Sequence, residues 1–158
     1  MNTGINRRPS LFIRLATPAD LPAILPLATH SSGAGRWPAG LYQRIFTDST
    51  PRRVALVVEE GSAVQAFLVA SVLDREREIE NIVVAESVRR QGFGKQLLDE
   101  FLGLCQKEAA KMIFLEVRES NLAARKLYEK CGFVANGRRP RYYPEPEEDA
   151  ILYQRILP

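Results

Sequence analysis

A short basic segment with two glycines is the part of the sequence that points most directly to chemistry. Residues 83–95 read VVAESVRRQGFGK, where a strand-like run gives way to a glycine turn and a long amphipathic stretch. Glycines let the backbone approach a ligand, and the first N–H groups of a helix are unpaired donors at its positive end. With Arg89, Arg90 and Lys95 beside it, the segment predicts a phosphate-binding turn. The alternative is a structural glycine turn beside a solvated basic helix start.

Two better-known phosphate-binding patterns do not fit this turn. The P-loop pattern G-x-x-x-x-G-K-[ST] is absent from the sequence. Gly92-Phe93-Gly94 lacks the third glycine of the dinucleotide fingerprint. The phosphate that this turn would take is therefore predicted to belong to another kind of ligand.

A glutamate near the end of an apolar run could act as a general base. Glu116 interrupts the run 112–117 and, by the alternation of a strand, shares a face with Met112 and Phe114. A carboxylate at the C-terminal end of a parallel strand lies where open α/β sheets bind their ligands. The alternative is a strand-end carboxylate that is paired with a nearby arginine such as Arg118.

A tyrosine and two further glutamates are the other candidates for moving protons. Tyr128 lies on the helix predicted after the same strand, and a phenol of pKa about 10 can reprotonate a departing thiolate of pKa about 8.5. Its alternative role is a core aromatic on one stripe with Ala124. Glu78 and Glu80, in the strand before the glycine turn, are rival candidates for the base, although a solvated strand edge is favoured for Glu78.

Composition and charge predict a single domain that does not bind DNA or RNA. The chain has 158 residues, 46% of them hydrophobic, and 22 Lys and Arg against 19 Asp and Glu give a net charge of +3. We expect a single domain over residues 1–158. No apolar stretch nears about 20 residues and no signal-peptide core is present, which predicts a cytoplasmic protein without a membrane segment. Arg138, Arg139 and Arg141 are followed by acidic residues at 145–149, so no basic surface for DNA or RNA is expected.

Histidine and cysteine are too few for a metal site or a thiol enzyme. His30 is the only histidine, so a Ser-His-Asp triad would rest on that imidazole. Cys105 and Cys131 lack zinc-type spacing, and no metal site is expected. Both cysteines lie on apolar stripes and are predicted to be buried packing residues, which disfavours a covalent intermediate on a cysteine.

Hydrophobic periodicity predicts the elements that must position these groups. Apolar runs bounded by turn residues predict strands at 11–16, 54–58, 66–73, 78–84 and 112–117, and near 133–136 and 150–156 on either side of a charged segment, 138–149. Helices are predicted from a Thr17 cap through about residue 28, then after a loop at 30–35 around residues 41–46, over 93–109, and from a Ser120-Asn121 cap to Gly132. The three strands between residues 54 and 84 form an antiparallel meander, and the second half alternates strand and helix as βαβ units do.

These segments resemble, in order, those of the GNAT acyltransferase superfamily. Arg89-x-x-Gly92-x-Gly94 resembles its acetyl-CoA pyrophosphate loop, and the C-terminal part resembles the RimI-type group, which acetylates the N-terminal alanine of a small-subunit ribosomal protein. The C-terminal likeness rests on FLEVRESN at 114–121, AARKLYEKCGF at 123–133, RR at 138–139, YYP at 142–144 and EDA at 148–150. The match covers about residues 76–156. It implies an α/β fold with a mixed central sheet of six or seven strands and helices on both faces.

The resemblance also implies roles for individual residues. Strand backbone groups would bind the pantetheine arm at Ile82, Val83 and Val84. The pyrophosphate would be surrounded by Arg89, Arg90, Gln91, Gly92, Phe93, Gly94 and Lys95. Asn121 would hydrogen-bond the cofactor, Glu116 matches the general base, and Tyr128 matches the general acid.

The implied activity is direct acetyl transfer from acetyl-CoA to an amine, with no metal. The acceptor implied by the RimI-type likeness is a protein N-terminus, on a small-subunit ribosomal protein. The sequence departs from that group's Pro-Trp-Ser-like motif, because residues 35–40 read GRWPAG. A small-molecule amine or a protein lysine therefore stays open as acceptor, as does an acetyl-CoA-binding module without turnover.

Overall fold

The computed structural model describes residues 10–30 and 37–158. This part of the chain forms a seven-stranded sheet in the order β1-β2-β3-β4-β5-β7-β6. The strands are β1 (Leu11–Leu15), β2 (Arg52–Glu60), β3 (Ala63–Leu73), β4 (Glu76–Val84), β5 (Met112–Arg118), β6 (Val134–Pro144) and β7 (Glu147–Ile156). The helices are α1 (Leu21–Thr29), α2 (Ala39–Thr47), α3 (Phe93–Lys107) and α4 (Leu122–Lys130), with 3-10 turns η1 (Pro18–Asp20) and η2 (Glu86–Val88). The mixed sheet confirms the predicted fold class.

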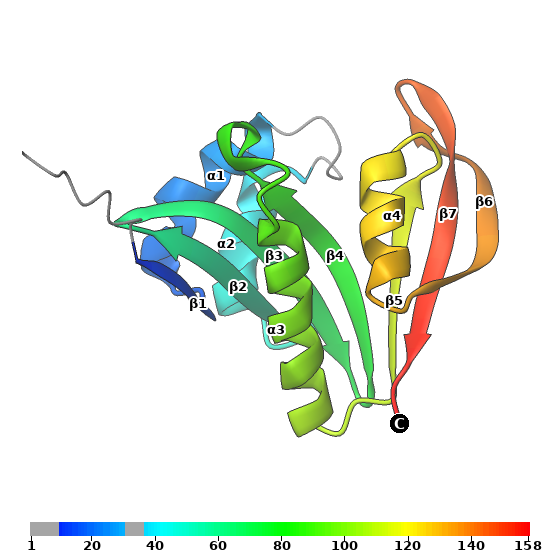
Figure 1. The fold of residues 1–158 in the computed structure, drawn as a ribbon, viewed down its shortest axis with the longest axis horizontal. Coiled ribbons are helices and arrows are strands. Elements are labelled where there is room, and N and C mark those ends of the chain that lie inside the picture. The colour runs from blue at the N-terminus through cyan, green and yellow to red at the C-terminus, as the bar shows by residue number, and fades with distance from the viewer. Residues whose placement is uncertain (1–9, 31–36) are drawn as a thin grey trace, which may run out of the picture.

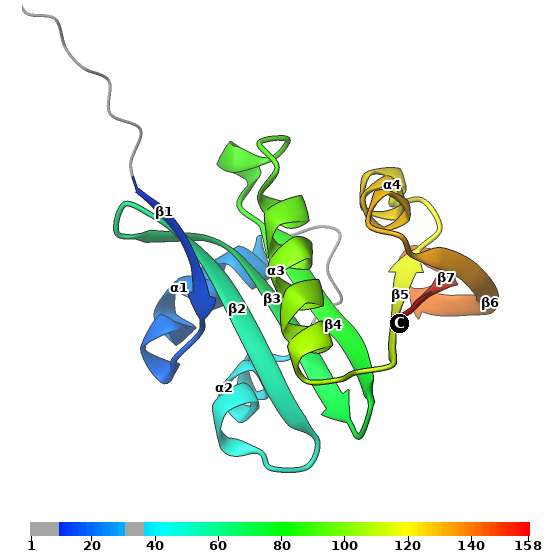
Figure 2. The same ribbon diagram turned by 60° about the horizontal axis from the view of Figure 1, so that its bottom comes forward.

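Helices cover both faces of the sheet (Figures 1 and 2). The apolar stripe of α3 packs with α4 on one face, in a cluster that includes Leu97, Phe101 and Leu115. The helices α1 and α2 cover the other face through a second cluster that includes Ile24 and Phe67. Burying both faces is what allows the central strands to be apolar almost throughout.

The sheet opens between β4 and β5, and this opening sets the position of the site. The two strands pair in parallel only from Glu76–Met112 to Ile79–Leu115. On the β3 side of β4, the register shifts so that Glu80 is an extra residue between Ile79 and Asn81. Beyond that bulge the strands diverge, and the N-terminal ends of α3 and α4 lie at the open end (Figure 1). The structure therefore brings two strand ends and two helix starts together.

Several boundaries differ from the sequence-based prediction. The strands predicted at 133–136 and 150–156 extend to form one long hairpin, and the charged segment between them is the hairpin itself. Pro140 is tolerated because β6 is the outer strand and the proline lies where its register with β7 shifts. Thr17 caps only the 3-10 turn, and α1 begins at Leu21. The long helix α3 ends at Lys107, two residues before the left-handed Ala109.

Parts of the prediction fall outside the described residues. The predicted loop at 30–35 lies there except for His30, and so does the start of the GRWPAG segment. In the described ranges, no helix is long and apolar enough to cross a membrane. The same ranges contain no group of three or more His, Cys, Asp or Glu side chains that could hold a metal ion.

Candidate active site

The glycine turn presents the start of α3 to the open end of the sheet. Gly92 is the N-cap with φ +85°, a left-handed conformation that favours glycine. No side chain of the described chain caps this helix end, so its first N–H groups are available as donors. A Cβ built on Gly92 would meet no described atom within 4 Å. The turn thus combines open space, backbone donors and the positive end of a helix dipole, which suits an anionic ligand.

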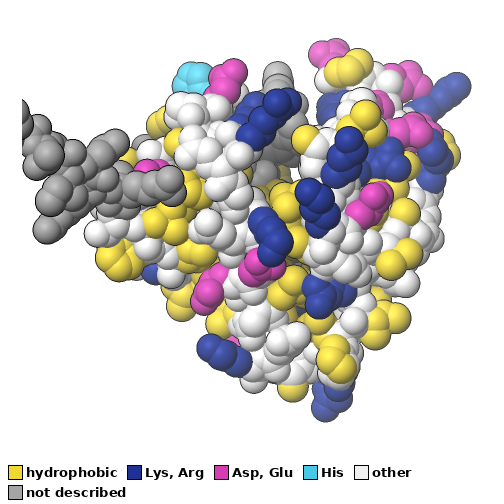
Figure 3. All heavy atoms as spheres, in the orientation of Figure 1, with side chains coloured by type: hydrophobic (Ala, Val, Ile, Leu, Met, Phe, Trp, Pro, Cys, Tyr) yellow, Lys and Arg dark blue, Asp and Glu magenta, His cyan; other side chains and the backbone are white. Residues whose placement is uncertain are grey.

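The predicted cations near this turn differ in whether they already form an ion pair. Arg89 and Arg90 are exposed, and Arg89 Nε donates to the Val84 carbonyl oxygen at 3.4 Å. Lys95 instead forms an ion pair with Asp99 one helical turn below, with Nζ and Oδ2 at 2.6 Å. Figure 3 shows Lys and Arg side chains gathered over the start of α3 and the facing side of α4. This region carries the exposed arginines predicted from the sequence, but the negative charge of Asp99 offsets the positive charge of Lys95.

Two residues of the predicted pyrophosphate site are buried and have only backbone groups to offer a ligand. The Phe93 side chain is buried in the core beside α3. Gly94 is buried as well, and a Cβ there would lie 3.0 Å from Leu127 Cδ2 of α4. The second glycine therefore suits the close packing of α3 against α4, in addition to the ligand approach predicted from the sequence. Gln91 and Gly92 are exposed on the turn.

The last residues of β4 and the start of α4 flank the opening. Ile82, Val83 and Val84 lie beyond the last described β4–β5 pair, so the edge of β4 that faces β5 carries no partner strand there. Asn121 is the N-cap of α4, and its Oδ1 accepts from the Ala124 N–H at 3.2 Å. That cap confirms the predicted start of the helix. The cofactor contacts of these four residues remain a prediction.

Glu116 lies on β5 at the same opening, held by β6. Its Oε1 is 2.7 Å from Arg139 Nε, and the side chain is 18% exposed. The Glu116 carboxylate raises the pKa of the nearby Tyr142 hydroxyl. Arg118, the partner considered from the sequence, pairs instead with Glu148 at 3.3 Å.

Two more carboxylates lie near Glu116. Glu80 accepts from Arg53 Nε at 2.8 Å, and the Arg53 guanidinium lies 5.5 Å from the centre of the Trp37 ring. Glu78 is half-buried, contrary to the solvated edge favoured from the sequence. Burial raises the pKa of Glu78, and the neighbouring carboxylates of Glu80 and Glu116 raise it further. This face therefore holds three carboxylates near two arginines and favours a cationic guest.

Tyr128 lies on α4, and its ring is part of the hydrophobic core. It is 5% exposed and packs edge-on against Phe133, with ring centres 5.8 Å apart. Burial raises the pKa of its hydroxyl well above the ordinary value. The core position predicted as the alternative is thus correct, and the raised pKa keeps the phenol protonated at neutral pH. Its role as an acid remains a prediction. Cys105 and Cys131 are buried as expected.

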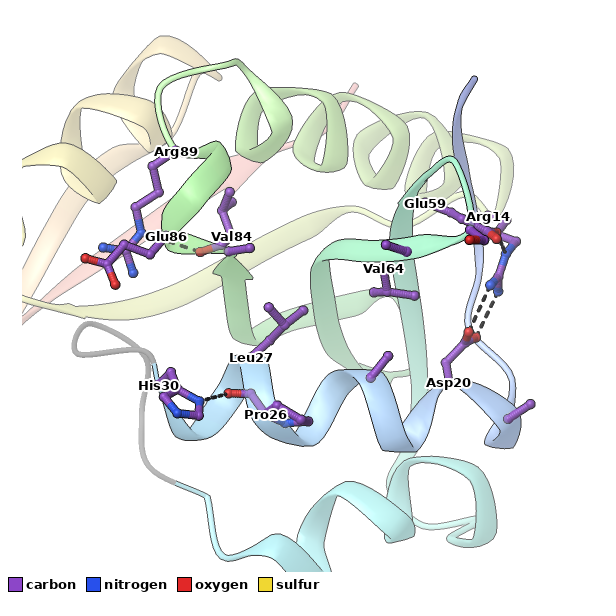
Figure 4. Close-up of a pocket in the computed structure, with 15 residues that line it drawn as sticks. Arg14, Asp20, Pro26, Leu27, His30, Glu59, Val64, Val84, Glu86 and Arg89 are labelled. Atoms are coloured by element: carbon purple, nitrogen blue, oxygen red, sulfur yellow. Dashed lines mark hydrogen bonds and ion pairs between the residues drawn. The ribbon is translucent and has the colours of Figure 1, made fainter. Parts of the chain in front are cut away.

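A cavity of about 560 Å³ lies on another side of the molecule, along α1 (Figure 4). Apolar residues of α1 and β3 form its walls. Its ends carry the Arg14–Asp20 ion pair and, at the other end, His30 and Arg89. It meets the predicted cofactor residues only at Val84 and Arg89, and it excludes Glu116. The chemistry is therefore assigned to the sheet opening and not to this cavity.

The structure adds residues that sequence reasoning missed. Arg139 and Arg53 approach the carboxylates from β6 and β2, and no spacing rule links them to Glu116 or Glu80. From the sequence, only the acidic residues after Arg139 are expected as its partners. The sequence leaves two roles open for Tyr142 and Tyr143, lining an acceptor groove or packing under the final hairpin, and the structure places Tyr142 against Arg139.

Comparisons with known proteins agree with this geometry. The family described as Acetyltransferase (GNAT) family matches residues 22–133. An uncharacterized protein of Mycobacterium leprae, ML0378, is 32% identical over 148 residues, which make up 92% of this chain and 40% of that protein. The ribosomal protein bS18-alanine N-acetyltransferase of Escherichia coli K12 is 37% identical over 95 residues, 59% of this chain and 64% of that protein. The chain thus spans less than two thirds of the length of either relative.

A solved structure extends the similarity over nearly the whole chain. The crystal structure of the ribosomal-protein-S18-alanine N-acetyltransferase from Escherichia coli matches with a TM-score of 0.85 and 28% identity. The match covers 93% of this chain and 94% of that chain. The hairpin that carries Arg139 and Tyr142 lies beyond the residues matched by the family. The chain belongs to the acetyltransferase (GNAT) family.

Proposed function

We propose that this protein is an acyltransferase that moves an acetyl group from acetyl-CoA to the α-amino group of a protein N-terminus. One observation carries the proposal: the opening between β4 and β5 joins a glycine turn suited to phosphate with a face of carboxylates suited to an ammonium group. A donor with an anionic tail and an acceptor with a cationic head would meet at such a junction.

The residues present fit acetyl-CoA. The first N–H groups of α3, with Arg89 and Arg90, would bind the pyrophosphate. The unpaired edge of β4 at residues 82–84 would offer backbone groups to the amide-containing pantetheine arm. The Asn121 side chain would add a hydrogen bond at the start of α4. Acetyl-CoA supplies the acetyl group as an activated thioester.

The chain's own contribution is to position the reactants and to move two protons. Glu116 Oε1 or Oε2 would accept a proton from the acceptor ammonium, directly or through water. A backbone N–H near Val84 would stabilise negative charge on the reacting carbonyl. Tyr128 would hold a proton on Oη for the departing sulfur. Its raised pKa keeps the phenol protonated and makes the transfer of that proton to the sulfur more costly than from an ordinary tyrosine.

An α-amino group is the acceptor that this arrangement favours. Its pKa of about 8, against about 10.4 for lysine, makes deprotonation near neutral pH cheaper by roughly 3 kcal/mol. The carboxylates of Glu78, Glu80 and Glu116 favour a cationic head group. The relative named as a bS18-alanine N-acetyltransferase supports an N-terminal alanine, on a ribosomal protein of the cytoplasm, as the specific target.

A panel of acceptors tests this function. The protein would be mixed with acetyl-CoA and short peptides that differ only in the first residue. Parallel reactions would hold an N-blocked peptide with an internal lysine or a polyamine. We expect thiol release and a mass increase of one acetyl group on the free N-terminus, fastest with alanine first.

Other outcomes of the same panel would overturn the proposal. Turnover only on lysine or on the polyamine would assign a different acceptor class. Acetyl-CoA binding by calorimetry without thiol release on any amine would favour a binding module. Comparing the protein N-termini of a host with and without this protein would then test whether a ribosomal protein is the target.

A further inference from the structure

The outer strand β6 has a bulge next to the candidate active site. Arg139 pairs with Ala150 of β7, and Tyr143 pairs with Glu148. Four steps along β6 therefore match two steps along β7, which leaves two extra residues in β6. Arg141, within this stretch, has φ +54°, a left-handed conformation that is unusual for a side chain of its size. The bulge turns β6 away from a regular ladder over residues 140–142.

One carboxylate of β7 fixes the bulge from both sides. Asp149 Oδ1 accepts from the Arg141 backbone N–H at 2.9 Å. Its Oδ2 accepts from Arg138 Nη1 at 2.7 Å. Arg138 also donates to Glu119 Oε1 at 2.7 Å, which ties the bulge to the end of β5. These donors lower the pKa of Asp149, so the carboxylate stays charged at neutral pH.

The bulge presents two donors to Glu116. Arg139 Nε lies 2.7 Å from Glu116 Oε1, and the Tyr142 hydroxyl lies close enough to the same carboxylate for Glu116 to raise the pKa of that tyrosine. The Arg139 guanidinium lies 5.6 Å from the centre of the Tyr142 ring, so the two side chains also contact each other. Since β7 separates β6 from β5 in the sheet, only long side chains aimed across β7 can reach Glu116.

We propose that Arg139 and Tyr142 are positioning residues that fix the Glu116 carboxylate in the orientation required for accepting a proton. This inference rests on the proposed function, in which Glu116 is the general base. A carboxylate on a strand can rotate about its side-chain bonds, and two donors from one anchored bulge restrict that rotation. Displacing a reacting group by about 1 Å can lower the reaction rate about a hundredfold, so residues that fix its orientation increase the rate.

Arg139→Gln tests the proposal, with Arg44→Gln as a matched control. Arg44 has the same 57% exposure, and its Nε lies 2.8 Å from Asp48, but on α2, away from Glu116. We expect Arg139→Gln to lower kcat about tenfold to a hundredfold, with acceptor KM changed less than about twofold. Arg139→Lys should recover part of the loss, and Tyr142→Phe should lower kcat by a smaller factor. Arg44→Gln should behave as wild type.

A double variant separates positioning from a general loss of structure. In a Glu116→Gln background, Arg139→Gln should lower kcat no further, because its effect passes through Glu116. The thermal midpoints of Arg139→Gln and Arg44→Gln should agree within a few degrees.

Three results would contradict the inference. Arg139→Gln with wild-type kcat would remove its positioning role. A lower acceptor KM at unchanged kcat would instead make Arg139 a competitor of the acceptor ammonium for Glu116. Additive losses in the double variant would place the effect of Arg139 elsewhere. A Glu116→Gln protein with full kcat would reject the proposed mechanism itself, and this outcome is distinct from the others.

Discussion

The two sides of the sheet opening are built in opposite ways. On the proposed cofactor side, one continuous segment from Val84 to Lys95 supplies a left-handed glycine, backbone donors and two exposed arginines. On the proposed acceptor side, Glu78, Glu80 and Glu116 come from β4 and β5, while the arginine partners of Glu80 and Glu116 come from β2 and β6. Backbone geometry thus defines the first region, and side-chain contacts between distant segments define the second.

This difference predicts which measurable quantity each region controls. A defect in the turn should weaken binding of the phosphate-bearing donor, because the turn would bind the phosphates of the donor, which do not react. A defect among the side chains that move protons should slow turnover, because these groups act mainly in the transition state. Variants can therefore separate KM for acetyl-CoA from kcat.

Tyr128→Phe should have the largest effect among the variants that sharpen this contrast. Removing the hydroxyl removes the proposed proton donor while the ring stays packed against Phe133. We expect kcat to fall about a hundredfold, with KM for acetyl-CoA within about twofold. Steady-state thiol release measures both. Tyr153→Phe, a second buried tyrosine with its hydroxyl bonded to Glu129, is the control, and an equal loss there would reduce Tyr128 to a packing residue.

Gly92→Ala should affect binding instead. The left-handed φ of +85° costs a non-glycine residue about 1 kcal/mol or more, which shifts the turn away from the conformation that exposes its donors. We expect KM for acetyl-CoA to rise about tenfold while kcat changes less than about twofold. A fall in kcat at constant KM would break the proposed division between the two regions.

Asp20→Asn should alter stability and leave both regions intact. Asp20 is 6% exposed, accepts two bonds of 2.8 Å from Arg14, and has a lowered pKa because of that guanidinium. A carboxyl with a lowered pKa stabilises the fold above its ordinary pKa, and that stabilisation is lost as pH falls through the folded value.

We expect Asp20→Asn to lower the free energy of unfolding by about 1 to 2 kcal/mol at neutral pH. The gap from wild type should shrink as the pH falls below about 4. Denaturant unfolding at several pH values measures it. A gap that is independent of pH would show that the charge of Asp20 is not responsible, and a changed kcat at neutral pH would link this corner to the site.

Gly103→Ala should have the smallest effect and is matched to the Gly92 variant. Gly103 lies inside α3, its φ is not positive, and an added Cβ would meet no described atom within 4 Å. Alanine should therefore stabilise the helix by about 0.5 to 1 kcal/mol without changing KM. Thermal unfolding and steady-state kinetics check both. A raised KM for acetyl-CoA would mean that the helix as a whole, and not the turn, governs donor binding.

The same contrast explains what the sequence could predict. Gly92, the Asn121 cap and Gly132 follow from local backbone preferences, which depend on a few neighbouring residues. The stripe of α3 and the alternation of β5 likewise predicted the buried faces. Most of the fold is therefore predictable from local patterns, because the buried side of each helix or strand sets the spacing of its apolar residues.

The acceptor side was less predictable because its partners lie far apart in the chain. Glu116 and Arg139 meet because a long side chain next to the β6 bulge reaches across β7, and no local pattern encodes that contact. Phe93 and Lys95 occupy predicted positions, but tertiary packing buries one and Asp99 pairs with the other. The sequence predicts which charged side chains lie near the site, but which of them form ion pairs with each other is known only from the folded structure.

The most direct test of the account compares two carboxylates of the same face. Glu116→Gln and Glu80→Gln would be assayed side by side for kcat on an alanine-first peptide. We predict a loss of about a hundredfold to ten-thousandfold for Glu116→Gln, and of less than about tenfold for Glu80→Gln, because Glu80 pairs with Arg53 of β2, on the side of β4 away from β5. Wild-type kcat in Glu116→Gln from roughly pH 6 to 9, or the larger loss in Glu80→Gln, would contradict the assignment of Glu116 as the base.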